Sequence, residues 1–479
     1  MTKSNVEDTF NVFLENQKCA IRLIQSMSSL IYEKSVELTL FKNSLREEGV
    51  SEMLKLHKKN LTTKEVSVAL TAEIAAQLEK MDLRPVTIDI GRLAGAWTEA
   101  DDGTQTLAEF MQEYLKEALG AGNSKMTPKD VVLFGFGRIG RLVCRELIEQ
   151  AGRGRQLRLK AIVVRSVDAD SIQKRAALIN NDSVHGQFAA DVTVDQENHL
   201  LIINGQVVKF IAASCPEEID YEKHGIEDAL VIDNTGAYTS KEELARHLKA
   251  KGAKKVILTA PGKDTKNVVF GVNEGDLDLD NDEIFTAASC TTNAISPVLQ
   301  VIEREFGIEK GHVETIHAYT NDQNLLDNMH KKYRRGRSAA MNMVITSTGA
   351  GKAVSQIIPS LLGKLTSNAV RVPCPNGSLA IMNLKLGKQV TVEEVNRVIR
   401  REAEDGKLAN QINFSTDPET VSSDIIGNVC CSVFDSSATI VSPDSGSVVL
   451  YVWYDNEYGY SMQVVRLAKY VSHVFRQVF

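Results

Sequence analysis

Cys290 stands in a segment whose residue types suit nucleophilic chemistry. The segment reads Phe285-Thr-Ala-Ala-Ser-Cys-Thr-Thr-Asn293, so a strand-like apolar run ends in a cysteine between hydroxyl side chains, and a helix-like run follows. A cysteine at a helix N-terminus is expected to have a lowered pKa, because the helix dipole and the free N–H groups favour the thiolate. Taken alone, however, a cysteine is more often a small buried apolar residue. Local context therefore leaves Cys290 open between a nucleophile and a packing residue.

A cysteine nucleophile needs a base, and His317 is the strongest candidate among the nine histidines. It lies in Thr315-Ile-His-Ala-Tyr-Thr-Asn-Asp322, where a strand-like run enters a polar loop. An imidazole at the end of a strand, with hydroxyls and an acid just beyond it, could take up a thiol proton. Most histidines are surface residues or satisfied core residues, so it is this placement that distinguishes His317 from the others.

A glycine-rich loop follows the apolar run Val131–Phe134. It reads Gly135-Phe-Gly137-Arg-Ile-Gly140, and the helix-like stretch Arg141–Leu147 comes next. Between a strand and a helix, this spacing predicts a dinucleotide site. The first glycine permits the tight turn, the second lets the backbone approach a pyrophosphate, and the third allows close helix–strand packing. The alternative is a purely structural turn.

The next strand-like run ends in an arginine where an acidic residue would bind the ribose of NAD. It reads Val163-Val-Arg165-Ser166, and the nearest acid is Asp168. Arg165 would suit the additional phosphate of NADP. Alternatively, Arg165 is solvated and Asp168 binds the ribose after a small local shift. The cofactor is therefore NAD or NADP.

The elements that would position these groups begin at Val131. Short β-branched runs alternate there with helix-like stretches, which predicts a parallel sheet built from βαβ units. These runs are Val131–Phe134, Ala161–Val164, Leu200–Ile203, Leu230–Ile232 and Lys255–Leu258. After Cys290 the runs become longer and alternate apolar and polar residues, which predicts an antiparallel sheet. These are Val313–Thr320, Leu379–Lys385 and Ser447–Tyr454, and a helix-like segment over 462–479 ends the chain.

Residues 1–125 have a different character. They contain one proline, Pro85, and amphipathic stripes such as Leu107, Phe110, Met111 and Leu115. We predict an all-helical extension of three or more helices. It has no catalytic character, and it either packs on its own protein or docks another protein, whose nature the sequence leaves unknown.

Composition excludes several classes of protein. The net charge of −7 does not call for nucleic acid or an anionic membrane, and no apolar run is long enough for a transmembrane helix. The basic run Lys331–Arg337 is interpreted as a solvated loop rather than a nucleic-acid surface. Seven scattered cysteines without Cys-x-x-Cys pairs, and the lack of a secretory signal, indicate a cytoplasmic protein without a zinc site.

Taken in order, ten segments resemble the phosphorylating glyceraldehyde-3-phosphate dehydrogenase family. The resemblance runs from about Lys129 to the C-terminus, nearly three-quarters of the chain, and residues 1–125 fall outside it. The segments are Gly135–Arg141, Asp182–Gly186, Thr235-Gly236, Ala260-Pro261, Ala288–Asn293, His317–Gln323, Arg334–Ala340, Ser347–Gly349, Ala369–Pro373 and Trp453–Glu457.

The resemblance implies an α/β fold in which a Rossmann-type parallel-sheet cofactor domain over 126–289 is completed by the C-terminal helix at 462–479. An α+β catalytic domain with an antiparallel sheet would span 290–461, after the helical extension at 1–125. The expected assembly is a homotetramer, with the loop from Asp322 to Ile345 between subunits.

The implied reaction is the reversible, phosphorylating oxidation of D-glyceraldehyde 3-phosphate to 1,3-bisphosphoglycerate with NAD or NADP. Cys290 would form a thioester that inorganic phosphate cleaves, and His317 would activate the thiol and handle the protons. Such a reaction belongs to glycolysis and gluconeogenesis.

The resemblance also assigns binding roles. Together with Arg165, the cofactor residues are Gly135, Gly137, Arg138, Ile139, Gly140, Thr235, Gly236 and Asn456, the last orienting the nicotinamide carboxamide. Thr320, Asp322 and Arg371 match the site for the substrate's phosphate. Ser289, Thr291, Thr348, Gly349 and, in some states, Arg335 match the site for the attacking phosphate.

Three departures from the family pattern stand out. The acid after the second strand is displaced or replaced, and Asn328-Met329 stands where NAD-type members have Leu-Pro; both weaken a strict NAD assignment. The family's second cysteine is Ala294 here, without consequence for the chemistry. Two alternatives remain: a relative that oxidises erythrose 4-phosphate and hydrolyses the thioester, and a regulatory or scaffold protein that acts through its extension.

Overall fold

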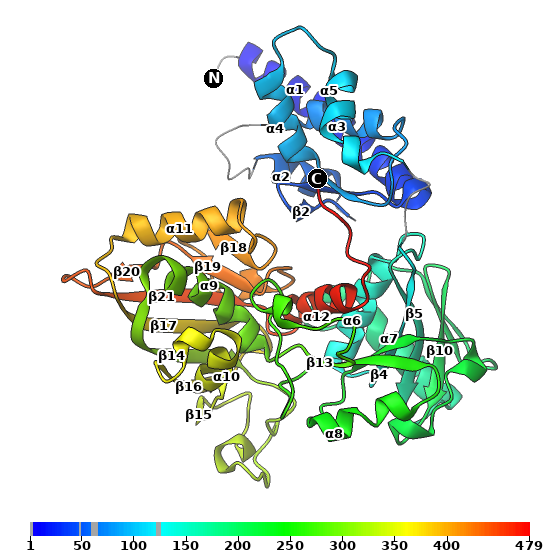
Figure 1. Cartoon of the computed structure of the whole chain (residues 1–479), viewed down its shortest axis with the longest axis vertical. Helices are drawn as coiled ribbons and strands as arrows, with labels where there is room; N and C mark the ends of the chain where they lie inside the picture. Colours follow the sequence, from blue (N-terminus) through cyan, green and yellow to red (C-terminus); the bar gives the residue numbers. More distant parts are fainter. Residues whose placement is uncertain (1–2, 47–48, 59–65, 121–125) are drawn as a thin grey trace. The chain divides into compact units, whose positions relative to one another are not determined.

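The computed structural model describes residues 3–46, 49–58, 66–120 and 126–479, with side chains from residue 8 onward. The chain forms two compact units (Figure 1). The first comprises Met1–Pro128, Ala151–Gln156 and Val474–Phe479, and the second comprises Lys129–Gln150 and Leu157–His473. The predicted boundary after residue 125 falls outside the described residues, and the predicted division of the rest at residue 289 stays a prediction.

The first unit is mainly helical and also contains a small sheet. Its helices are α1 (Lys3–Ser29), α2 (Val50–Lys58), α3 (Val68–Leu78), α4 (Ile90–Ala100) and α5 (Leu107–Tyr114). Its strands β1 (Glu37–Leu40), β2 (Asn43–Ser44) and β3 (Thr87–Asp89) pair in the order β2-β1-β3. The expectation of an all-helical extension is thereby corrected. Strands of two to four residues are too short to show a period of two in the sequence.

The C-terminal tail completes this unit. Helix α12 (Tyr458–Val471) ends before the tail, so the helix expected over 462–479 is shorter than predicted. Beyond it, Thr87 N donates to Gln477 O at 3.0 Å and Phe479 N donates to Thr87 O at 3.0 Å. The tail is extended because β3 offers its backbone groups an external partner, which no local sequence pattern reveals.

The first sheet of the second unit is parallel over most of its width. Its order is β13-β12-β11-β4-β5-β10-β9-β8. The strands are β4 (Lys129–Phe134), β5 (Leu157–Val164), β8 (Val192–Asp195), β9 (Leu200–Ile203), β10 (Gln206–Ala212), β11 (Ala229–Asp233), β12 (Ala253–Leu258) and β13 (Ile284–Thr286). Helices α6 (Arg138–Glu149), α7 (Ala169–Asn180) and α8 (Lys241–Leu244) belong to this half. The predicted Rossmann-like sheet is confirmed.

One strand of the predicted parallel set runs the other way. β9 pairs antiparallel with both β8 and β10. The turn between β9 and β10 is Asn204-Gly205, and both residues have positive φ, 48° and 75°. Two-residue Asn-Gly turns join antiparallel neighbours, so this hairpin signal outweighs the βαβ pattern at that point.

The second sheet is mostly antiparallel, as predicted. Its order is β15-β16-β14-β17-β21-β19-β18, with β20 on β21, and the pairs β14–β16 and β18–β19 are parallel. The strands are β14 (Ile308–Ala318), β15 (Val344–Thr346), β16 (Leu365–Val372), β17 (Ser378–Leu386), β18 (Ile412–Ser415), β19 (Ser432–Asp435), β20 (Ile440–Val441) and β21 (Ser447–Tyr454). Every second residue of β21 is buried, as a sheet with one covered face requires.

Helix α9 (Cys290–Phe306) lies against that covered face, together with α10 (Ala350–Ile357) and α11 (Val392–Glu404) (Figure 1). Its apolar residues Ile295, Val298 and Ile302 share a core cluster with Met382 and Val452 of the strands. This packing anchors the N-terminus of α9, where Cys290 lies.

Candidate active site

Cys290 is the first residue of α9, in a turn determined by several hydrogen bonds. Ser289 caps the helix, and its Oγ accepts a hydrogen bond from Thr292 N at 3.0 Å. Asn293 Nδ2 donates to Ser289 O at 2.9 Å. Ala288 has a φ of 53°, a conformation that non-glycine residues adopt at a cost. The backbone is therefore strained at Ala288, close to the thiol, and the hydrogen bonds of Ser289 and Asn293 stabilise this turn.

The structure brings Cys290 and His317 together. The Sγ of Cys290 lies 3.5 Å from Nε2 of His317, which is 5% exposed near the end of β14. On its other side, His317 Nδ1 lies 2.6 Å from Ala318 O. With the proton on Nδ1 and shared with Ala318 O, the lone pair of Nε2 faces the thiol, as a general base requires.

Arg371 is the nearest cation to this pair. His317 and Arg371 are register partners on the parallel strands β14 and β16. Arg371 Nη1 donates to Ala318 O at 2.8 Å and lies 3.5 Å from Thr320 Oγ1. The structure therefore places the predicted phosphate residues Arg371 and Thr320 beside the catalytic pair.

Burial and the neighbouring cations set the protonation of the pair. Burial, then Arg371 and Arg335, lower the pKa of His317 to about 3. Burial raises the pKa of the Cys290 thiol, although Arg371 and the Thr291 N–H act in the opposite direction. The expected lowering of the thiol pKa at the helix N-terminus is therefore corrected, because desolvation outweighs it. Without ligand, the pair is a neutral thiol facing a neutral imidazole.

Tyr454 and Ser378 support the site and were not among the site residues predicted from the sequence. Tyr454 is 1% exposed, its OH lies 3.0 Å from Thr291 Oγ1, and its ring meets the His317 ring edge-on. Ser378 Oγ donates to Asn456 Oδ1 at 2.8 Å and accepts from Ala318 N at 3.1 Å. Ser378 therefore bridges Asn456, which is predicted to orient the nicotinamide, and the backbone of Ala318, the residue that follows His317. Long-range contacts of this kind leave no local signal.

The other predicted phosphate residues occupy neighbouring loops. Asp322 forms an ion pair with the buried Arg335, whose Nε donates to Thr346 Oγ1 at 3.2 Å. Thr348 Oγ1 accepts from Ala350 N at 3.2 Å, and Gly349 precedes α10 with no side-chain cap. Asp322 therefore pairs with Arg335 and not with Arg371, although the family resemblance places Asp322 and Arg371 in the same phosphate site.

The glycine loop fits a dinucleotide. Gly135 has a φ of 91°, and a Cβ there would lie 2.7 Å from Thr235 Cγ2. A Cβ on Gly140 would lie 2.6 Å from Gly135 O, so this glycine allows the close packing of α6. A Cβ on Gly137 would meet nothing within 4 Å, and Gly137 is the N-cap residue of α6, without a side-chain cap. The open backbone N–H groups at this point suit a pyrophosphate.

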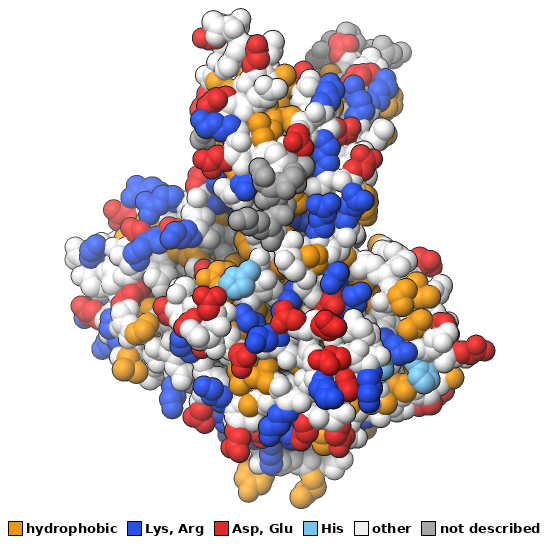
Figure 2. Space-filling view, turned by 45° about the vertical axis from the view of Figure 1, so that its right-hand side comes forward, with side chains coloured by type: hydrophobic (Ala, Val, Ile, Leu, Met, Phe, Trp, Pro, Cys, Tyr) orange, Lys and Arg blue, Asp and Glu red, His pale blue; other side chains and the backbone are white. Residues whose placement is uncertain are grey.

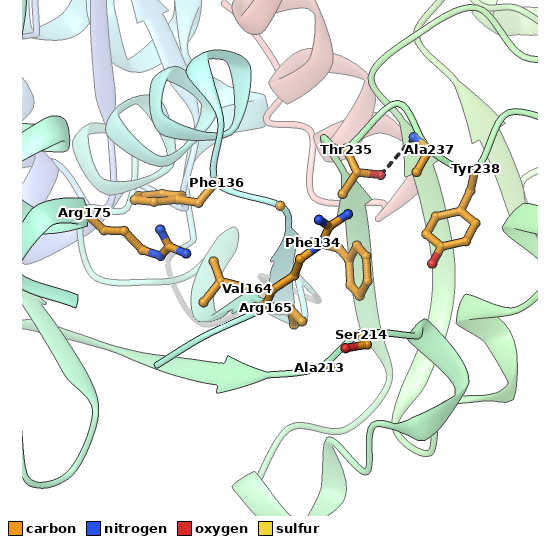
Figure 3. Close-up of a pocket in the computed structure, with 12 residues that line it drawn as sticks. Phe134, Phe136, Val164, Arg165, Arg175, Ala213, Ser214, Thr235, Ala237 and Tyr238 are labelled. Atoms are coloured by element: carbon orange, nitrogen blue, oxygen red, sulfur yellow. Dashed lines mark hydrogen bonds between the residues drawn. The ribbon is translucent and has the colours of Figure 1, made fainter. Parts of the chain in front are cut away.

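A cleft of about 290 Å³ opens beside this loop (Figure 3). Its walls come from the ends of β4, β5 and β11 and from α7, and they include Gly135, Arg165, Arg175 and Thr235. Asp168 does not line it: its carboxylate caps α7 by accepting from Ser171 N at 2.9 Å. The Asp-x-x-Ser spacing is a capping pattern that could have been recognised in the sequence.

The remaining predicted cofactor residues lie around the loop but outside the cleft. Ile139 and Arg138 form the first turn of α6, and Gly236 follows Thr235 with a φ of 65°. Arg138 forms ion pairs with Glu457, the N-cap residue of α12, and with Asp182 of β6 (Asn181–Asp182).

Two surface features bear on other kinds of partner. In the basic run, Arg337 pairs with Asp327 at 2.9 Å and Arg335 is buried, so it is not a continuous basic surface. Basic and acidic side chains intermingle over most of the face in Figure 2. Within the described ranges, no helix is both long and apolar enough to cross a membrane, and no three His, Cys, Asp or Glu residues are grouped as metal ligands would be.

Comparisons with known proteins agree with this geometry. A family model described as "Glyceraldehyde 3-phosphate dehydrogenase, NAD binding domain" matches residues 129–241, and one described as its "C-terminal domain" matches residues 289–456. The glyceraldehyde-3-phosphate dehydrogenase of Priestia megaterium is 42% identical over 339 residues, and glyceraldehyde-3-phosphate dehydrogenase 1 of Bacillus subtilis is 43% identical over 340. Each alignment covers 71% of this chain and 96% of the relative.

A relative from Pseudomonas aeruginosa shares more of the chain. It is named "Glyceraldehyde-3-phosphate dehydrogenase-like protein" and is 48% identical over 412 residues, which cover 86% of this chain and 88% of that protein. This alignment is longer than the part from Lys129 to Phe479, so it includes part of the extension. The two domain models and these relatives show that the chain belongs to the glyceraldehyde-3-phosphate dehydrogenase family, a family of nicotinamide-dependent oxidoreductases.

Proposed function

We propose that the enzyme catalyses the reversible, phosphorylating oxidation of D-glyceraldehyde 3-phosphate to 1,3-bisphosphoglycerate. The observation that carries the proposal is the buried pair of Cys290 and His317, 3.5 Å apart, with Arg371 beside it. A thiol, a base and an anion-binding guanidinium in contact are what acyl-thioester chemistry on a phosphorylated aldehyde requires.

The residues of this site divide the work. His317 Nε2 accepts the proton of the Cys290 thiol while Sγ attacks the aldehyde carbon, and the same nitrogen returns the proton to the oxyanion. Bound NAD(P) supplies the hydride acceptor when this hemithioacetal is oxidised. His317 takes the hydroxyl proton in that step, and a thioester remains on Cys290. Inorganic phosphate then attacks the thioester carbon, the bond from this carbon to Sγ breaks, and the acyl phosphate leaves. His317 returns its proton to Sγ, which restores the neutral pair, and the proton of the attacking hydrogen phosphate passes to solvent.

Arg371 links substrate binding to this chemistry. Its charge helps to keep the pKa of His317 low, which makes the imidazole a weak base in the free enzyme. A substrate phosphate at Arg371 and Thr320 would offset this charge and allow the pKa of His317 to rise. The base would thus strengthen when the aldehyde is in place.

The test is the initial rate of nicotinamide reduction with glyceraldehyde 3-phosphate, with and without inorganic phosphate, with NAD and NADP in parallel. We expect phosphate-dependent turnover that falls by at least about 10⁴-fold in Cys290→Ser and by about 10²–10⁴-fold in His317→Asn. Cys19→Ala, a substitution in the extension, is the matched control and should retain full activity.

Other outcomes would redirect the assignment. Turnover that is indifferent to phosphate indicates thioester hydrolysis, as expected for an erythrose 4-phosphate dehydrogenase. Folded protein with a titratable Cys290 but no turnover with either cofactor contradicts the proposed substrate. That result would favour a regulatory or scaffold role.

We further propose a homotetramer. The loop between β14 and β15 exposes a set of large apolar side chains, which monomeric proteins rarely leave in water. Exposed fractions are 70% for Leu325, 73% for Leu326, 94% for Met329, 82% for Met341 and 76% for Met343. A second copy of the chain is the occupant that the family resemblance suggests. Sedimentation equilibrium should give four chains, and Leu326→Glu should reduce this number.

We also propose that the enzyme works in the cytoplasm. Each of the seven cysteines is a free thiol in the part of the chain that the structure describes, as is typical of a reducing compartment. Cell fractionation with antibody detection tests this, and recovery from an extracellular or periplasmic fraction would contradict it.

A further inference from the structure

Two arginines that form no hydrogen bond or ion pair with the described residues line the cleft beside the glycine loop. Arg165 follows the last residue of β5, and Arg175 comes from α7. Figure 3 shows their guanidinium groups on opposite sides of the cleft, Arg175 beside Phe136 and Arg165 on the side of Phe134 and Thr235. Most arginines in such structures reach a carboxylate or a carbonyl, so two that do not, in one cleft, indicate an anionic ligand.

Arg175 is the less exposed of the two side chains. Arg175 Nε is buried and has no hydrogen-bond acceptor among the described residues. A buried donor left in this state costs free energy that a ligand oxygen would recover. By contrast Arg138, at the other end of the same loop, is fully engaged by Glu457 and Asp182.

The cleft also lacks the acid that would select NAD. None of the residues that line it is an Asp or a Glu. The carboxylate of Asp168, the nearest candidate by sequence, accepts hydrogen bonds from Ser171 N and from the hydroxyl of Ser166. Asp233 is fully buried. Its carboxylate accepts a hydrogen bond from Thr235 N at 2.7 Å and contacts His247 Nε2 at 3.0 Å.

We infer that Arg165 and Arg175 form a binding site for the 2′-phosphate of NADP, and that the enzyme prefers NADP to NAD. In a dinucleotide fold the adenosine ribose lies at the end of the second strand, which is β5 here. A phosphate monoester carries a charge of about −1.5 to −2 at pH 7, and two planar guanidinium groups can each bind it through two hydrogen bonds. Arg175 is therefore a specificity residue that sequence order alone did not single out. The inference rests on the proposed function, because it names the cofactor of that reaction.

The test uses fragments of the cofactor and needs no catalysis. Isothermal titration of the full chain should show that 2′,5′-ADP binds at least about tenfold more tightly than 5′-AMP, the gain expected for hydrogen bonds to a charged group. Arg165→Gln and Arg175→Gln should each reduce this preference by about tenfold while leaving the affinity for 5′-AMP nearly unchanged. Lys174→Gln is the matched control, because Lys174 precedes Arg175 on α7 but is exposed and paired with Asp170 at 2.6 Å.

The two proposals fail in different ways. Equal affinities for 2′,5′-ADP and 5′-AMP, or arginine variants that weaken both fragments alike, would overturn the phosphate site even if the enzyme oxidises the aldehyde. A clear preference for 2′,5′-ADP supports the site even if no aldehyde is turned over. In steady-state kinetics the arginine variants should raise the KM for NADP with little change in kcat, whereas a merely structural role would lower kcat with both cofactors.

Discussion

Arg371 Nη1 lies 3.0 Å from His317 Nδ1, because the two residues are direct register partners on the parallel strands β14 and β16. A permanent cation at this distance disfavours a second positive charge on the imidazole. The same guanidinium also reaches Ala318 O and Thr320 Oγ1, so one side chain connects the base to the predicted phosphate residues.

The reactivity of Cys290 should follow its burial rather than its place at a helix N-terminus. Burial raises the pKa of the thiol and Arg371 lowers it. We expect the rate of alkylation by iodoacetamide to reach half its maximum at a pH above that of an ordinary thiol. In Arg371→Leu the midpoint should move further up, because the cation that favours the thiolate is gone. Arg397→Leu, an exposed position on α11, is the control. A midpoint near neutral pH would show that the helix N-terminus dominates.

His317 should make the enzyme sensitive to acid. Its pKa is about 3 in the folded chain and about 6.5 when unfolded, so between these values only the unfolded chain binds the proton. The stability contributed by the neutral imidazole is complete above pH 6.5 and is lost as the pH falls toward 3. The free energy of unfolding should fall by up to about 1.4 kcal/mol per pH unit from this residue.

Urea unfolding from pH 7 to pH 4 would measure this effect. His317→Asn should flatten the slope, whatever its effect on absolute stability. His224→Asn removes an exposed imidazole and should leave the slope as it is. An unchanged slope in His317→Asn would contradict a buried neutral imidazole.

Two glycines of the nucleotide loop should separate binding from folding. In Gly140→Ala the new Cβ would lie 2.6 Å from Gly135 O, so we expect a loss of about 1–3 kcal/mol in unfolding free energy and weaker cofactor binding. In Gly137→Ala the Cβ meets no atom within 4 Å, and the φ of −78° suits alanine. Stability should persist, while the cofactor Kd rises by at least about tenfold, because the methyl group occupies the path of the pyrophosphate.

Calorimetry and cofactor titration on the same samples would measure both quantities. Gly275→Ala is the control, since no atom lies within 4 Å of its Cβ either and it is outside the loop. Normal cofactor affinity in Gly137→Ala would argue against this loop as the pyrophosphate site.

Removal of residues 474–479 should destabilise the first unit and spare the catalytic pair. The deletion removes the backbone partners of Thr87 and Asp89 and the buried Arg476, which pairs with Glu37. We expect faster hydrogen exchange at Thr87 and Asp89 and a lower melting temperature for this unit, while the alkylation of Cys290 stays normal. Val478→Ala keeps the backbone and alters a side chain that is 54% exposed, so it should behave as wild type. Unchanged protection of β3 in the deletion would contradict a structural role for the tail.

Much of the second unit could be predicted because its signals are local. The strand before Gly135, the glycine spacing and the helix after Gly140 follow one another along the chain, and each is a pattern of backbone geometry that neighbouring residues impose. The same is true of Cys290, which follows a strand and begins a helix. Where a local signal was overlooked, as with Asn204-Gly205, the direction of a strand was predicted wrongly.

Tertiary structure alone decided the rest, because it depends on groups distant in the sequence. Register across two strands places Arg371 against His317, and burial by α9 and the sheet sets the pKa values that the helix N-terminus alone did not predict. The C-terminal tail is extended only because β3 presents backbone groups that pair with it. Arg175 enters the cleft because of how α7 packs against β8 and α6. The residue types determined what chemistry was possible, whereas distances and desolvation, which are properties of the packed chain, decided which of those groups meet and in what charge state.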